Sequence, residues 1–202
     1  MLLPIFIGLL IIMFAFMHMN DQKVTKTKES FWRKEQEANN TKKQTLDDLD
    51  YIHIPIDTLP LHRNDADETL AKIEQEIMVL SNSEIVNFTE ISNTDLKLTY
   101  GVANLPALSG FDANYTKLVR TIYAWSVRLH ELGFTAEAIT VLEYGVSIQT
   151  DMSKHYTYLG QLYADQSSAD KLDELIGKAE LLTTSTKPVI LKHLNHIKSS
   201  LN

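Results

Sequence analysis

The apolar positions of the chain fall into three patterns. Residues 2–19 are apolar almost throughout, and no charged side chain occurs before His18. Residues 20–63 are mostly polar, and their last part mixes apolar residues with prolines. From residue 64 onward, apolar residues recur every three or four positions, which is the period of an amphipathic helix. The pattern predicts a membrane anchor at residues 1–19, a juxtamembrane linker at residues 20–63 and a helical domain at residues 64–202.

The apolar segment at residues 2–19 has the length of a short transmembrane helix. Such a helix needs about 20 apolar residues, with a lower limit near 17. A cleaved signal peptide is the alternative. However, only the amino terminus is basic before the segment, and no small-residue cleavage pattern follows it. We therefore prefer an uncleaved anchor that contacts the lipid bilayer through residues 2–19.

The side chains after the anchor predict its orientation. Basic residues gather behind the segment, at Lys23, Lys26, Lys28, Arg33, Lys34, Lys42 and Lys43. Basic residues next to a membrane helix favour the cytoplasmic side. We therefore expect a single-pass membrane protein with a cytoplasmic C-terminal domain.

The first part of the linker is expected to form a polar helix. Residues 24–44 contain neither proline nor glycine and carry many charged side chains. Phe31, Trp32 and Lys34 either contact lipid headgroups or belong to a solvated stalk, and we favour the stalk.

The second part of the linker, residues 51–61, is apolar but not helical in pattern. Pro55 and Pro60 each disfavour helix for the residue before them, so the segment is expected to be extended. An exposed apolar run of this length needs a partner surface. It either packs on the domain of the same chain, which we favour, or binds another protein.

The helical domain is predicted to contain a series of amphipathic helices. The first covers residues 66–80. The clearest runs from residue 113 to Leu132 and is closed by Gly133 in the C′ position. A turn of helix is expected at residues 84–88 and a loop at Ser109–Gly110. Four further helices are expected from Thr135 to about Thr150, around Tyr156–Tyr163, around Leu172–Ala179 and from Pro188 onward.

Two sets of residues recur at a spacing of 34. On the first helix of each pair, Ile122, Trp125, Ser126 and Leu129 recur as Tyr156, Leu159, Gly160 and Tyr163. On the second helix, Ala138, Leu142 and Gly145 recur as Leu172, Ile176 and Ala179. This pattern resembles the tetratricopeptide repeat (TPR), a helix–turn–helix unit with the same period.

The resemblance covers about residues 119–186, and it implies an all-α fold of antiparallel TPR-like helix pairs. The repeats are expected at about 119–152 and 153–186. Because one helix pair cannot bury its own apolar face, capping helices are expected on both sides, including one at 188–201. Thr150 and Thr184 replace the proline that usually ends a repeat, so the repeats are degenerate. A generic helical bundle with coincident spacing is the alternative.

In the TPR family, the first helix of each pair lines a concave groove that holds a peptide. By alignment with this family, seven residues are expected to face such a groove as partner-binding residues: Arg120, Tyr123, Val127, His130, Lys154, Thr157 and Gln161. Arg120 and Lys154 form a basic stripe that predicts selectivity for acidic peptides. The alternative is that all seven are ordinary exposed residues.

Composition narrows the possible functions. The net charge of -7 argues against nucleic-acid binding, and the absence of cysteine excludes thiol catalysis. The chain has none of the common phosphate-binding, dinucleotide, zinc-protease or serine-hydrolase motifs. His193 and His196 have no carboxylate beside them in sequence, so we prefer a surface or capping role to a metal site. We expect no enzyme activity, cofactor, metal or small-molecule substrate.

Two functional hypotheses remain. The first is a membrane-anchored interaction or scaffold protein that binds a protein or peptide partner. The second is a structural accessory subunit of an integral membrane complex. The short, lysine- and asparagine-rich chain suggests a bacterial source, and it resembles small anchored bacterial proteins of unassigned role, which implies no activity.

Overall fold

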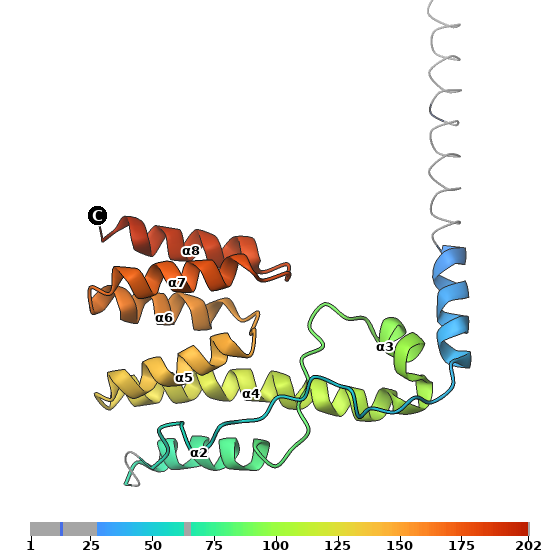
Figure 1. Ribbon diagram of the computed structural model, residues 1–202, viewed down its shortest axis with the longest axis horizontal. Coiled ribbons are helices and arrows are strands. Elements are labelled where there is room, and N and C mark those ends of the chain that lie inside the picture. The colour runs from blue at the N-terminus through green and yellow to red at the C-terminus, as the bar shows by residue number, and fades with distance from the viewer. Residues whose placement is uncertain (1–12, 14–27, 63–65, 202) are drawn as a thin grey trace, which may run out of the picture. The chain divides into compact units, whose positions relative to one another are not determined.

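A computed structural model describes residue 13 and residues 28–62 and 66–201 of the chain (Figure 1). These residues form helices and loops, and an isolated antiparallel bridge between Tyr51 and Val86 is their only β-type pairing. The expectation of an all-α fold is therefore confirmed for the described residues. The membrane helix expected at residues 2–19 lies outside them, except for Met13. Among the described helices, none is both long and apolar enough to span a bilayer.

The chain divides into two compact units. The first contains Met1–Asp47 and Ile91–Pro106, and the second contains Asp48–Glu90 and Ala107–Asn202. Each unit is thus assembled from two separate stretches of sequence. The predicted domain boundary between residues 63 and 64 lies outside the described residues.

In the first unit, a helix at residues 28–40 pairs with helix α3 (Asn93–Tyr100), which is capped by the Ser92 side chain. The contact is largely polar. Lys97 is only 8% exposed, and its ammonium group contacts the Glu35 carboxylate and donates to Asn39 Oδ1 at 3.0 Å. The hydrogen bond from Lys97 lowers the pKa of Glu35. The expected polar helix is therefore confirmed for residues 28–40, whereas residues 41–44 are not helical.

A short 3₁₀ helix, η1 (Val102–Asn104), follows α3. The residue between them, Gly101, has φ +88°, and a Cβ there would lie 2.5 Å from the Lys42 carbonyl oxygen. Only glycine combines this backbone conformation with such a close approach. The Asn104 side chain donates to the Gln44 carbonyl at 2.8 Å and fastens the same loop.

The second unit contains α2 (Glu68–Leu80) and most of α4 (Leu105–Glu131). Four further helices complete it: α5 (Thr135–Ser147), α6 (Ser153–Asp165), α7 (Ala169–Glu180) and α8 (Lys187–Ser199). Consecutive helices from α5 to α8 lie against one another (Figure 1). The expected helices are confirmed within a few residues at each end, except for the start of α4. Moreover, the helix starts keep the repeat period, because α5 and α7 begin one period apart, and so do α6 and α8.

Two local predictions were wrong. Ser109–Gly110, expected to be a loop, lies within α4, because Leu108 and Phe111 are buried and extend its apolar stripe by two turns. Pro106 is compatible with this start, since proline is tolerated in the first turn of a helix. Residues 84–88, expected to form a turn of helix, are non-helical, and their Val86 forms the bridge to Tyr51.

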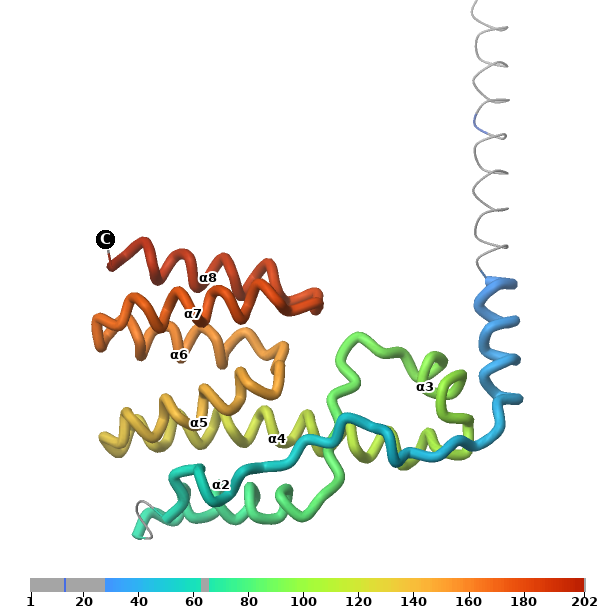
Figure 2. Tube along the Cα trace, viewed as in Figure 1, coloured from blue at the N-terminus to red at the C-terminus, as the bar shows by residue number. Residues whose placement is uncertain are grey.

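The apolar linker segment packs on its own chain. Ile54 and Leu59 are each 8% exposed and belong to the core of the second unit. The backbone N–H of His62 donates to Glu74 Oε2 on α2 at 3.0 Å, and Figure 2 traces the segment beside that helix. The preferred packing within the same chain is therefore confirmed. The segment covers apolar surface of the helices that water would otherwise contact.

The core of the second unit centres on α4. Ile122, Trp125 and Leu129 have no exposed surface, and they meet buried residues of α5 and α6 such as Leu142 and Leu159. Gly145 of α5 leaves room for this contact, because a Cβ there would lie 3.1 Å from Ile122 Cγ2. Small residues at such crossings let helices approach closely. This packing fixes which face of α4 remains accessible.

Candidate functional site

A cavity of about 830 Å³ lies between α4 and the start of α6 in the second unit. We call it the groove. Its wall includes one face of α4 between Asp112 and Tyr123, together with residues 151–154 at the α6 end. Residues 88–90, from the segment before α3, and Thr186, before α8, also line it. The groove is thus assembled from four stretches that are distant in sequence.

Three of the seven expected partner-binding residues line the groove: Arg120, Tyr123 and Lys154. Arg120 and Lys154 are exposed, whereas Tyr123 is half-buried. The other four do not line it. Val127 and His130 lie farther along α4, and Thr157 and Gln161 lie farther along α6.

The four residues outside the groove make local contacts. His130 Nδ1 lies 3.1 Å from Thr135 Oγ1, and its ring packs edge-on against Tyr158. The Gln161 amide donates to Asp165 on the same helix at 2.8 Å. Thr157 donates to the Ser153 carbonyl one turn earlier, and Val127 is half-buried. The expected seven-residue face is therefore divided, because three of its residues line the groove and four lie outside it.

An aromatic cluster forms the floor at one end of the groove. The Tyr123 ring stacks on His155 at a centroid distance of 6.0 Å and meets Tyr158 edge-on at the same distance. The Lys154 ammonium lies 5.6 Å from the Tyr123 centroid, where the ring face attracts a cation. Tyr123 is thereby held rigid, and a rigid aromatic side chain binds a partner with little loss of conformational entropy.

His155 supports this floor from below and is completely buried. Its Nε2 lies 2.8 Å from the Val119 carbonyl oxygen, so Nε2 carries the hydrogen and donates it. Its Nδ1 is buried and has no hydrogen-bond partner among the described residues. Burial lowers the pKa of His155 to about 4, although the bond to Val119 opposes the shift. The imidazole is therefore neutral at physiological pH.

Acidic residues line the groove as well, which the sequence interpretation missed. Asp112 lies on α4 two turns before Arg120, and Asp151 lies just before α6. Glu90 contributes a third carboxylate. The groove therefore carries both signs of charge, and the expected basic stripe is corrected to a mixed surface. The eight-residue spacing of Asp112 and Arg120, which places them near one helix face, was the available signal.

Residues 84–90, which we call the strap, contribute Phe88, Thr89 and Glu90 to the wall of the groove. The Asn87 side chain donates to the Tyr115 hydroxyl at 3.0 Å. Glu90 has a left-handed backbone with φ +67°, and its carboxylate accepts from the Ser185 N–H at 2.9 Å. This bond lowers the pKa of Glu90. The strap thus connects α4 with the turn between α7 and α8.

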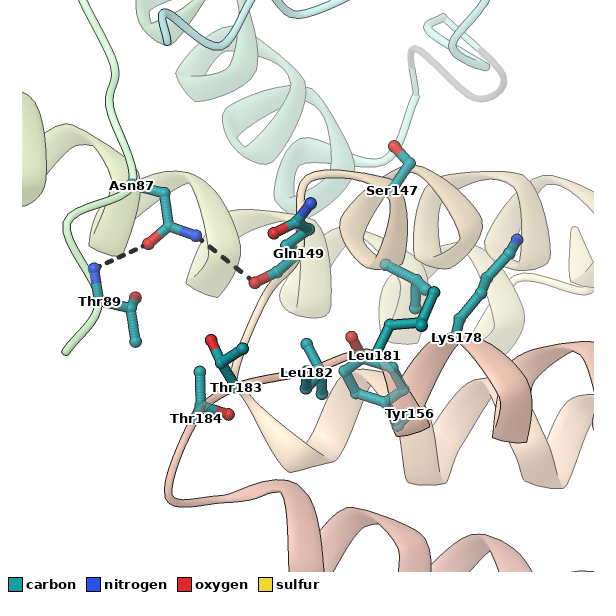
Figure 3. A pocket seen from close by; sticks show the side chains of 11 residues that line it. Asn87, Thr89, Ser147, Gln149, Tyr156, Lys178, Leu181, Leu182, Thr183 and Thr184 are labelled. Carbon is teal, nitrogen blue, oxygen red and sulfur yellow. Dashed lines mark hydrogen bonds between the residues drawn. The ribbon is translucent and has the colours of Figure 1, made fainter. Parts of the chain in front are cut away.

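A smaller cavity of about 410 Å³ lies on the other side of the strap (Figure 3). Asn87 faces it and donates to the Gln149 carbonyl at 3.5 Å, while its own side-chain oxygen accepts from the Thr89 N–H at 2.9 Å. Lys178 is the only charged residue among the described residues that line it. Tyr156 lines it as well, and burial raises the pKa of that phenol to about 12.

Comparison of the chain with known proteins found no match. No protein-family model matches the chain, and neither a curated protein nor a solved structure shows significant similarity to it. The functional argument therefore depends on the residues of this chain alone.

Proposed function

We propose that this protein is a membrane-anchored interaction or scaffold protein whose TPR-like helical domain binds a segment of a partner protein in the groove. The proposal depends on one observation. A single cavity of about 830 Å³ is lined by Arg120, Tyr123 and Lys154, which the sequence predicts to be partner-binding residues. A rigid aromatic floor with charged groups around it is typical of a peptide-binding surface.

The regular helix spacing supports the repeat component of the proposal. The repeat period separates both the first helices, α6 and α8, and the second helices, α5 and α7. The helix α8 would then be the first helix of a third, incomplete repeat that caps the array. A solenoid requires such a cap to cover the apolar face of its last complete repeat.

The sequence alone supports the membrane component. An apolar segment at residues 2–19 is followed by a basic cluster, so the groove would face the cytoplasm. The helical domain carries the whole net charge of -7, because residues 20–63 are neutral overall. An acidic domain is repelled by an anionic membrane surface, which keeps the groove accessible to a protein partner.

Site-specific crosslinking tests the proposal in the full-length protein. A photoreactive amino acid is placed at Lys154 in the groove and, as a matched control, at Asp170, which is exposed on α7. Irradiation of native membranes should give a discrete adduct from position 154 and none from position 170. Equal adducts from both positions, or none from either, would contradict a partner in the groove.

A second function, an accessory subunit of an integral membrane complex, is favoured by one observation. Phe31 and Trp32 are 52% and 66% exposed, and their rings pair edge-on at 5.6 Å on the helix that follows the expected anchor. An exposed aromatic pair at this place offers a contact surface for another membrane protein. Purification in mild detergent separates the two functions. A stoichiometric complex that Trp32→Ala dissociates supports the accessory subunit, and a monomer argues against it.

A further inference from the structure

The charged residues of the groove are sorted by sign along α4. Asp112 and Arg120 are eight residues apart, which corresponds to about 12 Å along a helix axis. The strap crosses α4 near Asp112, because Asn87 donates to the hydroxyl of Tyr115, which lies three residues further along. Tyr123 lies three residues beyond Arg120. The groove therefore has an acidic end near the strap and a basic end near the aromatic floor.

The start of α6 shows the same order of charges, with the acidic Asp151 followed by the basic Lys154. Asp151 lines the groove together with Tyr115, which lies one turn beyond Asp112 on α4. The Asp151 carboxylate raises the pKa of the phenols of Tyr115 and Tyr156, adding to the larger effect of burial. The ammonium group of Lys154 lies over the Tyr123 ring at the basic end. The groove wall thus receives one acidic and one basic side chain from α4, Asp112 and Arg120, and one of each from the start of α6, Asp151 and Lys154.

These charges are available to a ligand. Within the described part of the chain, the side chains of Asp112, Arg120 and Asp151 make no hydrogen bond or ion pair, and Lys154 contacts only the Tyr123 ring. Glu90 is different, because its carboxylate already accepts from Ser185. Charged groups that line one cavity without internal partners can be paired by a ligand of complementary charge.

We propose that the groove binds an extended peptide segment in which a basic and an acidic side chain lie four residues apart, the basic one between Asp112 and Asp151 and the acidic one between Arg120 and Lys154. An extended chain advances about 3.3 Å per residue and its side chains point alternately to opposite faces. A separation of four residues therefore covers the distance of about 12 Å between the two ends and keeps both side chains on one face. This inference rests on the proposed function and names the chemistry of the partner.

The strap determines what a ligand meets at the acidic end. Phe88 and Thr89 of the strap line the groove, and the Glu90 carboxylate accepts a hydrogen bond from the Ser185 N–H. At the basic end, Tyr123 offers apolar surface to a residue next to the acidic side chain. The two ends thus select different residue types.

A peptide array tests the inference with the full-length protein in detergent micelles. The probes are ten-residue peptides of alanine, serine and tyrosine that contain one lysine and one glutamate, one to six positions apart and in both orders. Peptides with only lysine, only glutamate or neither serve as controls. Binding should be strongest at a separation of four, and removal of either charge should weaken it about three- to fivefold, the range of a partly exposed ion pair.

Variants assign each end of the peptide to its protein residues. Arg120→Gln should lower the affinity of the best peptide about three- to fivefold but leave its glutamine analogue, which lacks the acidic side chain, unaffected. Asp112→Asn should likewise lower the affinity of the best peptide about three- to fivefold but leave the affinity of the analogue that lacks lysine unchanged. The control is Lys171→Gln, because Lys171 lies on α7 and pairs with Glu143 outside the groove. Unchanged circular dichroism of each variant shows that the fold is intact.

The outcomes separate this inference from the proposed function. If peptides bind but glutamate-only probes bind as well as those with both charges, the two-ended groove is wrong while a peptide-binding groove stands. The same holds if separation has no effect on affinity. If no peptide binds and crosslinking at Lys154 also yields no adduct, both proposals fail.

Discussion

Ser167 takes the same place after α6 that Gly133 takes after α4, one repeat period earlier. Both have left-handed backbones, with φ of 53° and 88°. The hydrogen bonds are the same: the N–H of each residue donates to the carbonyl three positions before it, and the next N–H donates five positions back, to Leu129 or Tyr163. These bonds define a Schellman motif, in which glycine is preferred.

Ser167→Gly should therefore stabilise the domain. A non-glycine residue with a left-handed backbone carries steric strain, which exceeds the entropy that glycine adds to the unfolded chain. We expect the free energy of unfolding to rise by about 0.5–1 kcal/mol. Urea denaturation measures it. The reciprocal change, Gly133→Ser, should lower the free energy of unfolding by a similar amount, and equal stability of all three proteins would contradict the shared motif.

Two helical glycines should respond in opposite ways to alanine. A Cβ at Gly145 would lie 2.7 Å from Nδ1 of the buried His155, whereas a Cβ at Gly177 of α7 would meet nothing within 4 Å. Gly145→Ala should lower the free energy of unfolding by about 1–3 kcal/mol through overpacking. Gly177→Ala should raise it by up to about 1 kcal/mol, because alanine favours helix. The difference in melting temperature between the two variants checks the helix contact.

The buried imidazole should make stability depend on pH. The pKa of His155 is about 4 in the folded protein, against 6.5 without burial. As pH falls, His155 therefore becomes protonated at a higher pH in the unfolded chain than in the folded protein. Stability from the neutral ring is complete above about pH 6.5 and is lost between pH 6.5 and 4, by roughly 3 kcal/mol at most.

Urea denaturation at several pH values between 7 and 4 measures this loss. His155→Gln should flatten the dependence in that range, while His193→Gln, at an exposed residue, should leave it unchanged. The carboxyl of Asp67 contributes only near the lower end of this range, because the hydrogen bond from Arg128 lowers its pKa to about 2 in the folded protein and its stabilisation is lost as pH falls toward and below 3.8. A slope that persists in His155→Gln would assign the pH dependence to another group.

The sequence predicts the helices well because their signals are local. The apolar stripe of α4 and the Gly133 stop depend on residues within a few turns of each other. The sequence predicts the loops poorly. Ser109–Gly110 looked like a break, yet the neighbouring Leu108 and Phe111 keep the helix intact by packing against residues far away in sequence.

The groove was predictable only in part for the same reason. The repeat spacing indicated Arg120, Tyr123 and Lys154, because all three lie on the first helices of the proposed repeats. Asp151 lies between helices, and Glu90 arrives on the strap, whose course depends on a bond to the distant Ser185. No short sequence pattern indicates that contact, so the mixed charge of the groove can be recognised only in the three-dimensional structure.

Trp125 provides the most direct test of the register of the proposed repeats. Its side chain has no exposed surface, and its indole N–H has no partner among the described residues. Trp125→Ala should lower the free energy of unfolding by about 3–5 kcal/mol, since the cavity is enclosed by residues of α4, α5 and α6. Trp125→Phe keeps most of the apolar volume and removes the unpaired donor, so it should cost less than about 1.5 kcal/mol. Equal unfolding free energies for wild type and Trp125→Ala would show that Trp125 lies outside the core and that the alignment of the two repeats is shifted.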